Sequence, residues 1–203
     1  MNLRVVAFCC AAFATAVCIF WIDKVIAPIF GVTYHIKTVE RIFSGPVLAT
    51  AAALFMVFLL GASTIRGHLT KASRILVIAC GFSILAYLLN RLLKILFGRL
   101  TPSIAAHNGV ADSFHFLQGD SQSGFPSGHM ALVGAFVGVL LHFSPSSKGI
   151  LLPLFFVLGA VLVIGNWHYL SDVIAGGVLG LGIGLLAANS CGNGKATGDK
   201  DCS

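Results

Sequence analysis

Six apolar segments, almost free of charge, limit what this chain can fold into. They cover residues 5–22, 42–65, 75–90, 130–143, 150–167 and 173–190. Charge-free apolar runs of about eighteen residues or more are typical of helices that cross a bilayer. The third and fourth segments are shorter, but their flanks can extend each to a full span. We therefore expect an all-α, polytopic membrane protein, built as a bundle of about six transmembrane helices.

The composition excludes an ordinary soluble domain. Of the 203 residues, 57% are hydrophobic and 10% are charged, which leaves too little polar surface to cover the apolar part. We expect one transmembrane domain over 1–190 and a polar, disordered tail over 191–203. The first segment also fits a secretory signal, because Arg4 precedes an apolar stretch, but its length favours a retained span.

The net charge of +6 reflects membrane topology rather than binding to nucleic acid, because no basic cluster with interleaved aromatic residues occurs. If six spans alternate, one side of the membrane carries slightly more positive residues. They are Arg4, Arg66, Lys71, Arg74, Lys148, Lys195 and Lys200. Such a side is usually cytoplasmic. We expect an integral protein of a bacterial inner membrane.

Five ionisable residues at the ends of these segments fall on the opposite, non-cytoplasmic face. They are Lys94, Arg99, His129, His168 and Asp172. Ionisable side chains in or beside a span are costly unless they are paired or hydrated, so such a group indicates function. Only the apolar segments determine the alternation of the spans, so the meeting of these five residues on one face is an independent indication of a site. We expect a site that faces the periplasm.

His168 and Asp172 stand in the stretch HYLSD, four residues apart. Residues with this spacing share one face of a helix. A carboxylate there can fix the tautomer of the imidazole and leave its other nitrogen nucleophilic. The alternative is a simple helix start, capped by Ser171 or Asp172.

The stretch FPSGHM opens the fourth apolar segment. Ser127 is a natural N-cap, and the backbone N–H groups that follow, from Gly128 on, suit a phosphate. His129 in the first turn can protonate a leaving oxygen. The alternative is an ordinary cap with a bystander histidine. With Lys94 and Arg99 as nearby cations, the set contains the parts that phosphoryl transfer needs.

No metal or other cofactor is expected. His107 and His115 lack zinc-ligand spacing with any cysteine, and the carboxylates are too scattered in the sequence for a two-metal site.

Three motifs resemble those of the type 2 phosphatidic acid phosphatase superfamily (lipid phosphate phosphatases and haloperoxidases), in its membrane-bound branch. The family patterns K-x6-R-P, P-S-G-H and S-R-x5-H-x3-D correspond to KILFGRLTP, PSGH and VLVIGNWHYLSD here. Order and separation agree over residues 66–188. The resemblance implies six helices with a phosphate pocket at the outer end of the bundle.

The resemblance also implies roles for single residues. His168 would be the nucleophile, Asp172 its partner and His129 the general acid. The phosphate oxygens would be held by Lys94, Ser127 and Gly128.

Two family arginines are missing. Thr101 stands in place of the first-motif arginine, and Leu162 in place of the third-motif arginine. A leucine cannot replace a fixed cation. Arg99 is close enough in sequence to Thr101 to swing toward the phosphate. Arg91, one turn before Lys94, can add positive field, and Asn166 can donate a neutral hydrogen bond near the lost third-motif charge.

We therefore expect a lipid phosphatase that acts through a phosphohistidine intermediate on a polyprenyl diphosphate, a phosphatidate-like lipid or lipid A. Its partners would be the lipid phosphate and the bilayer. The alternatives are a lipid phosphotransferase of the same family, a non-catalytic protein that binds lipid phosphates, and an electron-transfer protein with metal or haem ligated by histidines. The sequence leaves the oligomeric state open.

Overall fold

Long helices build the protein, as the computed structural model shows for residues 3–30, 44–110, 112–120 and 123–193. In chain order the elements are α1 (Leu3–Val17), the π-helical turn η1 (Cys18–Ile22), α2 (Asp23–Phe30), α4 (Gly45–Arg66), α5 (Lys71–Phe97), α6 (Pro102–Asn108), α7 (Gly128–Phe143), the 3-10 turn η2 (Pro145–Ser147), α8 (Lys148–Ile164) and α9 (Leu170–Asn193). No strand occurs in these ranges. The prediction of an all-α, polytopic membrane protein is confirmed.

Five helical segments within the described ranges are long and apolar enough to cross a membrane. They are Val6–Phe30, Gly45–Arg66, Lys71–Asn108, Pro145–Ile164 and Leu170–Ser190. The remaining expected span, the fourth, corresponds to α7, which is shorter at 16 residues. The first helix runs without a break past its expected end at Ile22 to Phe30. At the other terminus, residues 191–193 continue α9, and the rest of the expected tail, 194–203, lies outside the described residues.

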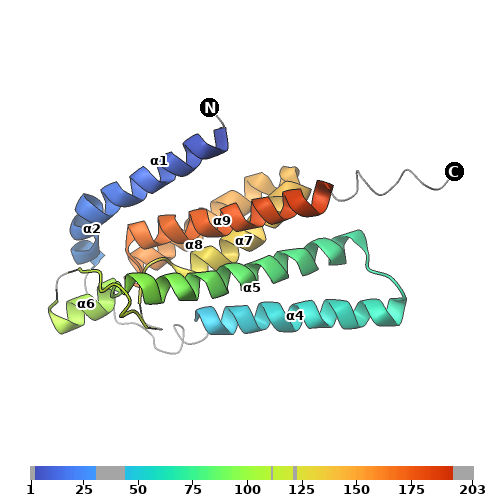
Figure 1. Ribbon diagram of the computed structural model, residues 1–203, viewed down its shortest axis with the longest axis horizontal. Coiled ribbons are helices and arrows are strands. Elements are labelled where there is room, and N and C mark those ends of the chain that lie inside the picture. Colours follow the sequence, from blue (N-terminus) through green and yellow to red (C-terminus); the bar gives the residue numbers. More distant parts are fainter. Residues whose placement is uncertain (1–2, 31–43, 111, 121–122, 194–203) are drawn as a thin grey trace.

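Helix α7 is the centre of the bundle and packs most extensively against α9, then against α5 (Figure 1). Glycines on α9 permit this contact. A side chain at Gly180 or Gly184 would collide with the carbonyl oxygens of Ala131 and Ala135 on α7. Such close approach between helices is typical of small-residue spacing in membranes. The result is a tightly packed pair of helices whose starts carry the candidate site residues.

Helix α4 has the opposite environment. None of its residues is buried, and it lies along α5 at the edge of the bundle in Figure 1. Its large apolar side chains, such as those of Leu54 and Phe58, are two-thirds exposed. A helix that is apolar all round needs lipid or protein to cover it, so this face is suited to the bilayer.

At one end of the bundle lie α2, α6, the end of α5 and the starts of α7 and α9 (Figure 1). Gly98 ends α5 in the left-handed conformation with φ 57°, and its N–H donates to the carbonyl of Lys94 at 2.9 Å. The loop over 112–120 then folds back onto this helix end. There the N–H groups of Leu117 and Gly119 donate to the carbonyls of Leu96 and Ile95. The otherwise unpaired C-terminal carbonyls are thereby satisfied.

Candidate active site

The turn between α8 and α9 presents His168. The N–H of His168 donates to the carbonyl of Leu162 at 3.2 Å, which folds the chain back at the end of α8. Asn166 in this turn has φ 57°, a conformation that asparagine tolerates better than most residues. The His168 side chain is only 6% exposed. The backbone of the turn therefore fixes where the imidazole lies.

Asp172, in the first turn of α9, faces this imidazole. Its Oδ2 lies 3.6 Å from Nδ1 of His168, slightly longer than a hydrogen bond, and accepts from the N–H of Tyr169 at 3.0 Å. Because Nδ1 faces the carboxylate, Nε2 is the nitrogen left for chemistry. The spacing in HYLSD predicts this approach of the two side chains, and the hydrogen bond from the Tyr169 N–H shows that Asp172 also helps to cap the start of α9.

The charge state of His168 follows from its surroundings. Burial lowers the pKa of the imidazole below its ordinary value, because the cation loses its hydration. The Asp172 carboxylate opposes this shift, while the positive charge of Lys94 adds to it. A lowered pKa keeps His168 neutral, which is the form that can attack an electrophile.

The PSGH stretch starts α7 and is held from two sides. Ser127 caps the helix, with its hydroxyl accepting from the N–H of Met130 at 3.5 Å, and its own N–H donates to the backbone carbonyl of Asp172 at 2.9 Å. The Asn90 amide donates to the carbonyl of Pro126 at 2.9 Å. The Ser127 side chain is fully buried and does not line the pocket described next, whereas Gly128 does.

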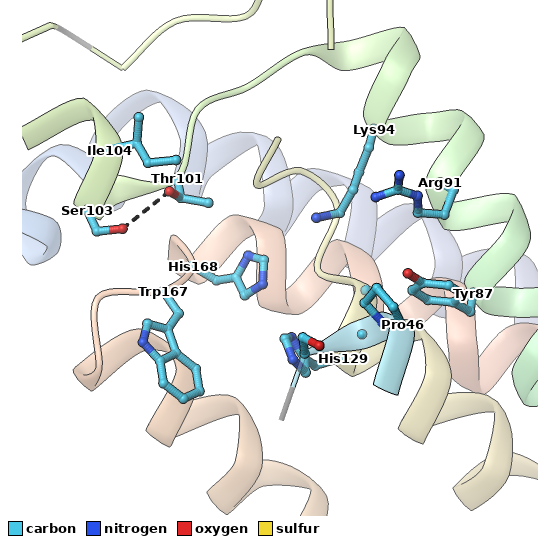
Figure 2. A pocket seen from close by; sticks show the side chains of 13 residues that line it. Pro46, Tyr87, Arg91, Lys94, Thr101, Ser103, Ile104, His129, Trp167 and His168 are labelled. Atoms are coloured by element: carbon cyan, nitrogen blue, oxygen red, sulfur yellow. Dashed lines mark hydrogen bonds between the residues drawn. The ribbon is translucent and has the colours of Figure 1, made fainter. Parts of the chain in front are cut away.

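A pocket of about 370 Å³ opens where these elements meet (Figure 2). Its walls come from the starts of α4, α6 and α7, the last turns of α5, and the turn before α9. The lining residues are Ser44, Gly45, Pro46, Tyr87, Arg91, Lys94, Thr101, Ser103, Ile104, Gly128, His129, Trp167 and His168. Three of the residues singled out in the sequence, His129, His168 and Lys94, thus meet at one cavity.

The two histidines are neighbours across this pocket. Their ring centroids lie 5.8 Å apart in an edge-on arrangement, and the His129 ring stacks near Trp167 at 6.5 Å. A phosphorus atom between them could be attacked from one side while its leaving oxygen receives a proton from the other. This separation suits the nucleophile and acid roles that the sequence predicts.

Lys94 points from the last turn of α5 toward His168 (Figure 2). Its ammonium donates to the carbonyl of Ser123, which fixes the long side chain. Among the described residues, none that lines the pocket is acidic. The ammonium is therefore placed to neutralise an anion held beside the histidine.

Arg99 lies elsewhere, and this corrects our expectation that it swings toward the phosphate. Its side chain is fully buried and does not line the pocket. Three carboxylates surround the guanidinium: Asp23 of α2 at 2.8 Å, Asp112 at 2.5 Å and Asp172 at 2.7 Å. We call these four residues the Arg99 cluster. Its arginine holds Oδ1 of Asp172, while Oδ2 of the same carboxylate faces His168.

Further contacts complete the Arg99 cluster. The Ser171 hydroxyl accepts from Arg99 at 2.6 Å and donates to Asp23 at 2.5 Å. The guanidinium also lies over the ring of Tyr169, with the carbon 4.0 Å from the centroid. Every polar group of this arginine is thus engaged, as a buried cation requires.

The two positions that lack the family arginines have different environments. Thr101 lines the pocket, and its hydroxyl lies 3.3 Å from that of Ser103. Leu162 is 1% exposed and packs in the apolar core with Met130 and Phe155. Asn166, expected near the lost charge, is buried in the turn beside Asp23 and Tyr169 and does not line the pocket.

Sequence reasoning missed Asp23, Tyr87, Trp167 and the start of α4. Asp23 was interpreted as the end of the first span, yet the helix continues beyond it. An acidic residue followed by further apolar helix is a signal that could have been used, because such a residue needs a buried partner. The pocket contacts of Tyr87 and Trp167 carry no sequence signal that we can name.

Comparison with known proteins agrees with this geometry. Residues 75–193 match the PAP2 superfamily. A lipid A 1-phosphatase of Rhizobium johnstonii is 35% identical over 101 residues, which cover 50% of this chain and 41% of that protein. The chain thus spans less than half the length of this curated relative. No solved structure gives a significant match.

Proposed function

The chain belongs to the PAP2 superfamily, and on that premise we propose that it is a membrane lipid phosphatase that removes a terminal phosphate through a phosphohistidine intermediate. One observation carries the proposal: His168, His129 and Lys94 share a single pocket at the end of a bundle of apolar helices. These are a nucleophile, an acid and a cation, which are the groups that phosphoryl transfer uses.

The first step forms a bond from Nε2 of His168 to phosphorus and breaks the bond from phosphorus to the leaving oxygen. The leaving oxygen takes the bonding electrons and a proton from His129. Asp172 supports the imidazole that becomes positively charged, since its Oδ2 faces Nδ1. Lys94 and the N–H groups at the start of α7 offset the charge on the phosphate oxygens.

The second step returns the protein to its starting state. Water attacks the phosphorus atom and gives its proton to His129, now a base. The bond from phosphorus to Nε2 of His168 breaks, and inorganic phosphate leaves. If a lipid hydroxyl replaces water, the same residues perform phosphotransfer, which is the first alternative activity.

The substrate class follows from the setting of the pocket. A site at the end of membrane-spanning helices meets a lipid headgroup, and the lipid A 1-phosphatase relative supports a lipid phosphate. Candidates are a polyprenyl diphosphate, a phosphatidate-like lipid and lipid A. We place the pocket at the periplasmic face of a bacterial inner membrane, on the charge distribution of the spans.

A non-catalytic, lipid-phosphate-binding protein is favoured by one observation. Neither Thr101 nor Leu162 supplies the charge that the family arginines would, and Leu162 lies in the apolar core. Loss of such contacts weakens binding of the transition state.

Release of inorganic phosphate by the purified, detergent-solubilised protein separates these possibilities. The panel contains a polyprenyl diphosphate, phosphatidate, phosphatidylglycerol phosphate and lipid A, each with and without chelator, beside His168→Ala. We expect release that survives the chelator and is lost in the variant. A folded protein that binds a lipid phosphate but releases none from any substrate contradicts the phosphatase and favours the binding protein.

A further inference from the structure

The last turns of α5 form one wall of the pocket. This wall carries two cationic side chains, whereas the catalytic steps above use only one of them to offset the charge of the reacting phosphate. Tyr87, Arg91 and Lys94 have the spacing i, i+4, i+7, which places them on one helix face, and all three line the pocket (Figure 2). Arg91 is half-buried. Neither the resemblance to the family motifs nor the catalytic steps above use Arg91 or Tyr87.

Arg91 has no carboxylate within ion-pair distance in the described ranges, while Arg99 has three. The part of the pocket lining that the structure describes contains no Asp or Glu. Like charges three residues apart on a helix repel each other, so the charges of Arg91 and Lys94 disfavour one another. An anion bound between them removes this repulsion.

The two cations serve different parts of the pocket. In Figure 2 the side chain of Lys94 lies between those of His168 and Arg91, and Arg91 lies beside Tyr87. Tyr87 in turn lies against the start of α4, where a side chain at Gly45 would come within 2.8 Å of its ring. Arg91 is therefore further from His168, the proposed nucleophile, than Lys94 is.

The positions of Arg91 and Lys94 along α5 show which of the two cations lies deeper in the membrane-spanning part. The helix ends at Phe97 near the loops, so Arg91 lies one turn further into the bundle than Lys94. A rise of about 1.5 Å per residue separates their backbones by about 4.5 Å along the axis. Because both side chains are long, each of these two cations can reach a different phosphate of a diphosphate. A lipid tail enters from the bilayer, so the phosphate attached to the tail would be the deeper one.

We propose that Arg91, with the hydroxyl of Tyr87, forms a second anion subsite that binds the tail-side phosphate of a lipid diphosphate. This rests on the proposed phosphatase and names its substrate class. The terminal phosphorus bonds to Nε2 of His168, and its bond to the bridging oxygen breaks. That oxygen keeps the electrons and takes the proton from His129, so it leaves as part of a lipid monophosphate, and the guanidinium of Arg91 offsets the negative charge of this leaving phosphate.

A matched pair of substrates tests the subsite: farnesyl diphosphate and farnesyl monophosphate, which share one tail. We expect the wild-type protein to prefer the diphosphate in kcat/KM. Arg91→Ala should lower the ratio of diphosphate to monophosphate by about tenfold or more, since a charged hydrogen bond is lost. Arg91→Lys should restore part of the ratio. Arg74→Ala, which removes an exposed charge at the other end of α5, should leave it unchanged.

The possible failures are distinguishable. An unchanged ratio in Arg91→Ala, with both rates measurable, overturns the subsite and leaves the phosphatase intact. If the wild-type protein hydrolyses neither farnesyl substrate, the lipid panel above decides the phosphatase, and thermal stabilisation by pyrophosphate relative to inorganic phosphate tests the subsite alone. Greater stabilisation by pyrophosphate that is lost in Arg91→Ala supports it, and equal stabilisation by the two anions in the wild-type protein contradicts it.

Discussion

Arg91 and Arg99 stand near the same end of α5 and use the same guanidinium in opposite ways. Arg99 is fully buried and meets three carboxylates. Arg91 lines an open pocket in whose described lining there is no acidic residue. A cation whose charge the fold already satisfies holds other side chains in place, and one that the fold leaves without a carboxylate is available to a ligand. The two arginines therefore have different roles: Arg99 stabilises the Arg99 cluster, and Arg91 is exposed to a ligand in the pocket.

Of the changes that test this comparison, removal of Arg99 should have the largest effect. Arg99→Ala leaves the buried carboxylates of Asp23 and Asp172, and the partly buried one of Asp112, without their cation, so we expect the free energy of unfolding to fall by about 3–5 kcal/mol. Arg91→Ala, the matched control, should change it by about 0.5 kcal/mol or less. Unfolding in detergent, followed by circular dichroism, measures both. Equal losses of unfolding free energy in the two variants would show that Arg99 contributes no more to stability than Arg91 does.

Removal of Lys94 tests the pocket side of the comparison. We expect Lys94→Ala to lower phosphate release by about a hundredfold, because the ammonium beside His168 stabilises charge in the transition state. Lys94→Arg should recover part of the rate. The unfolding midpoint should stay close to that of the wild-type protein, and a large drop in that midpoint would assign Lys94 to the scaffold instead.

Asp23 tests whether the first helix contributes to the Arg99 cluster. Its carboxylate accepts from Arg99, from the Ser171 hydroxyl and from the Ser171 N–H. In Asp23→Asn an amide nitrogen would face donors, so we expect a loss of about 2 kcal/mol in the free energy of unfolding. Lys24→Gln, a change at the exposed neighbour, is the control and should have no comparable effect. The same denaturation assay applies.

The smallest expected effect is on pH dependence. Burial lowers the pKa of His168, so the neutral nucleophile persists as pH falls through the ordinary histidine value of about 6.5. The acid limb of kcat/KM should therefore lie below that value. Lys94→Ala removes a charge that disfavours the imidazolium, and the limb in its residual activity should move to higher pH. A limb that moves to lower pH contradicts the electrostatic coupling.

The membrane fold and most of the site could be predicted from the sequence because their signals are local. Apolar runs of span length predict the helices, and alternation of spans brings Lys94, His129 and His168 to one end, as the structure shows. The fourth span was harder to recognise, since α7 has 16 residues and lies largely inside the bundle.

The role of Arg99 could not be predicted because its partners are remote in sequence. Asp23 lies 76 residues before it and Ser171 lies 72 residues after it. Proximity to Thr101 suggested a phosphate ligand, but side-chain direction at the end of α5 turns Arg99 toward α2 and α9 instead. For Arg91 the difficulty is the opposite: the sequence does not show which charged residues form no ion pair with a described carboxylate.

The central claim is that His168 forms a covalent bond to phosphorus. Rapid acid-free quenching of the protein with a lipid diphosphate radiolabelled in its terminal phosphate, followed by digestion and mass spectrometry, measures this directly. We predict an acid-labile, base-stable phosphate on the peptide that carries His168, absent from His168→Ala and more abundant in His129→Ala if hydrolysis of the intermediate becomes limiting. Turnover of the lipid by the wild-type protein with no labelled histidine, or label retained in His168→Ala, would contradict the account.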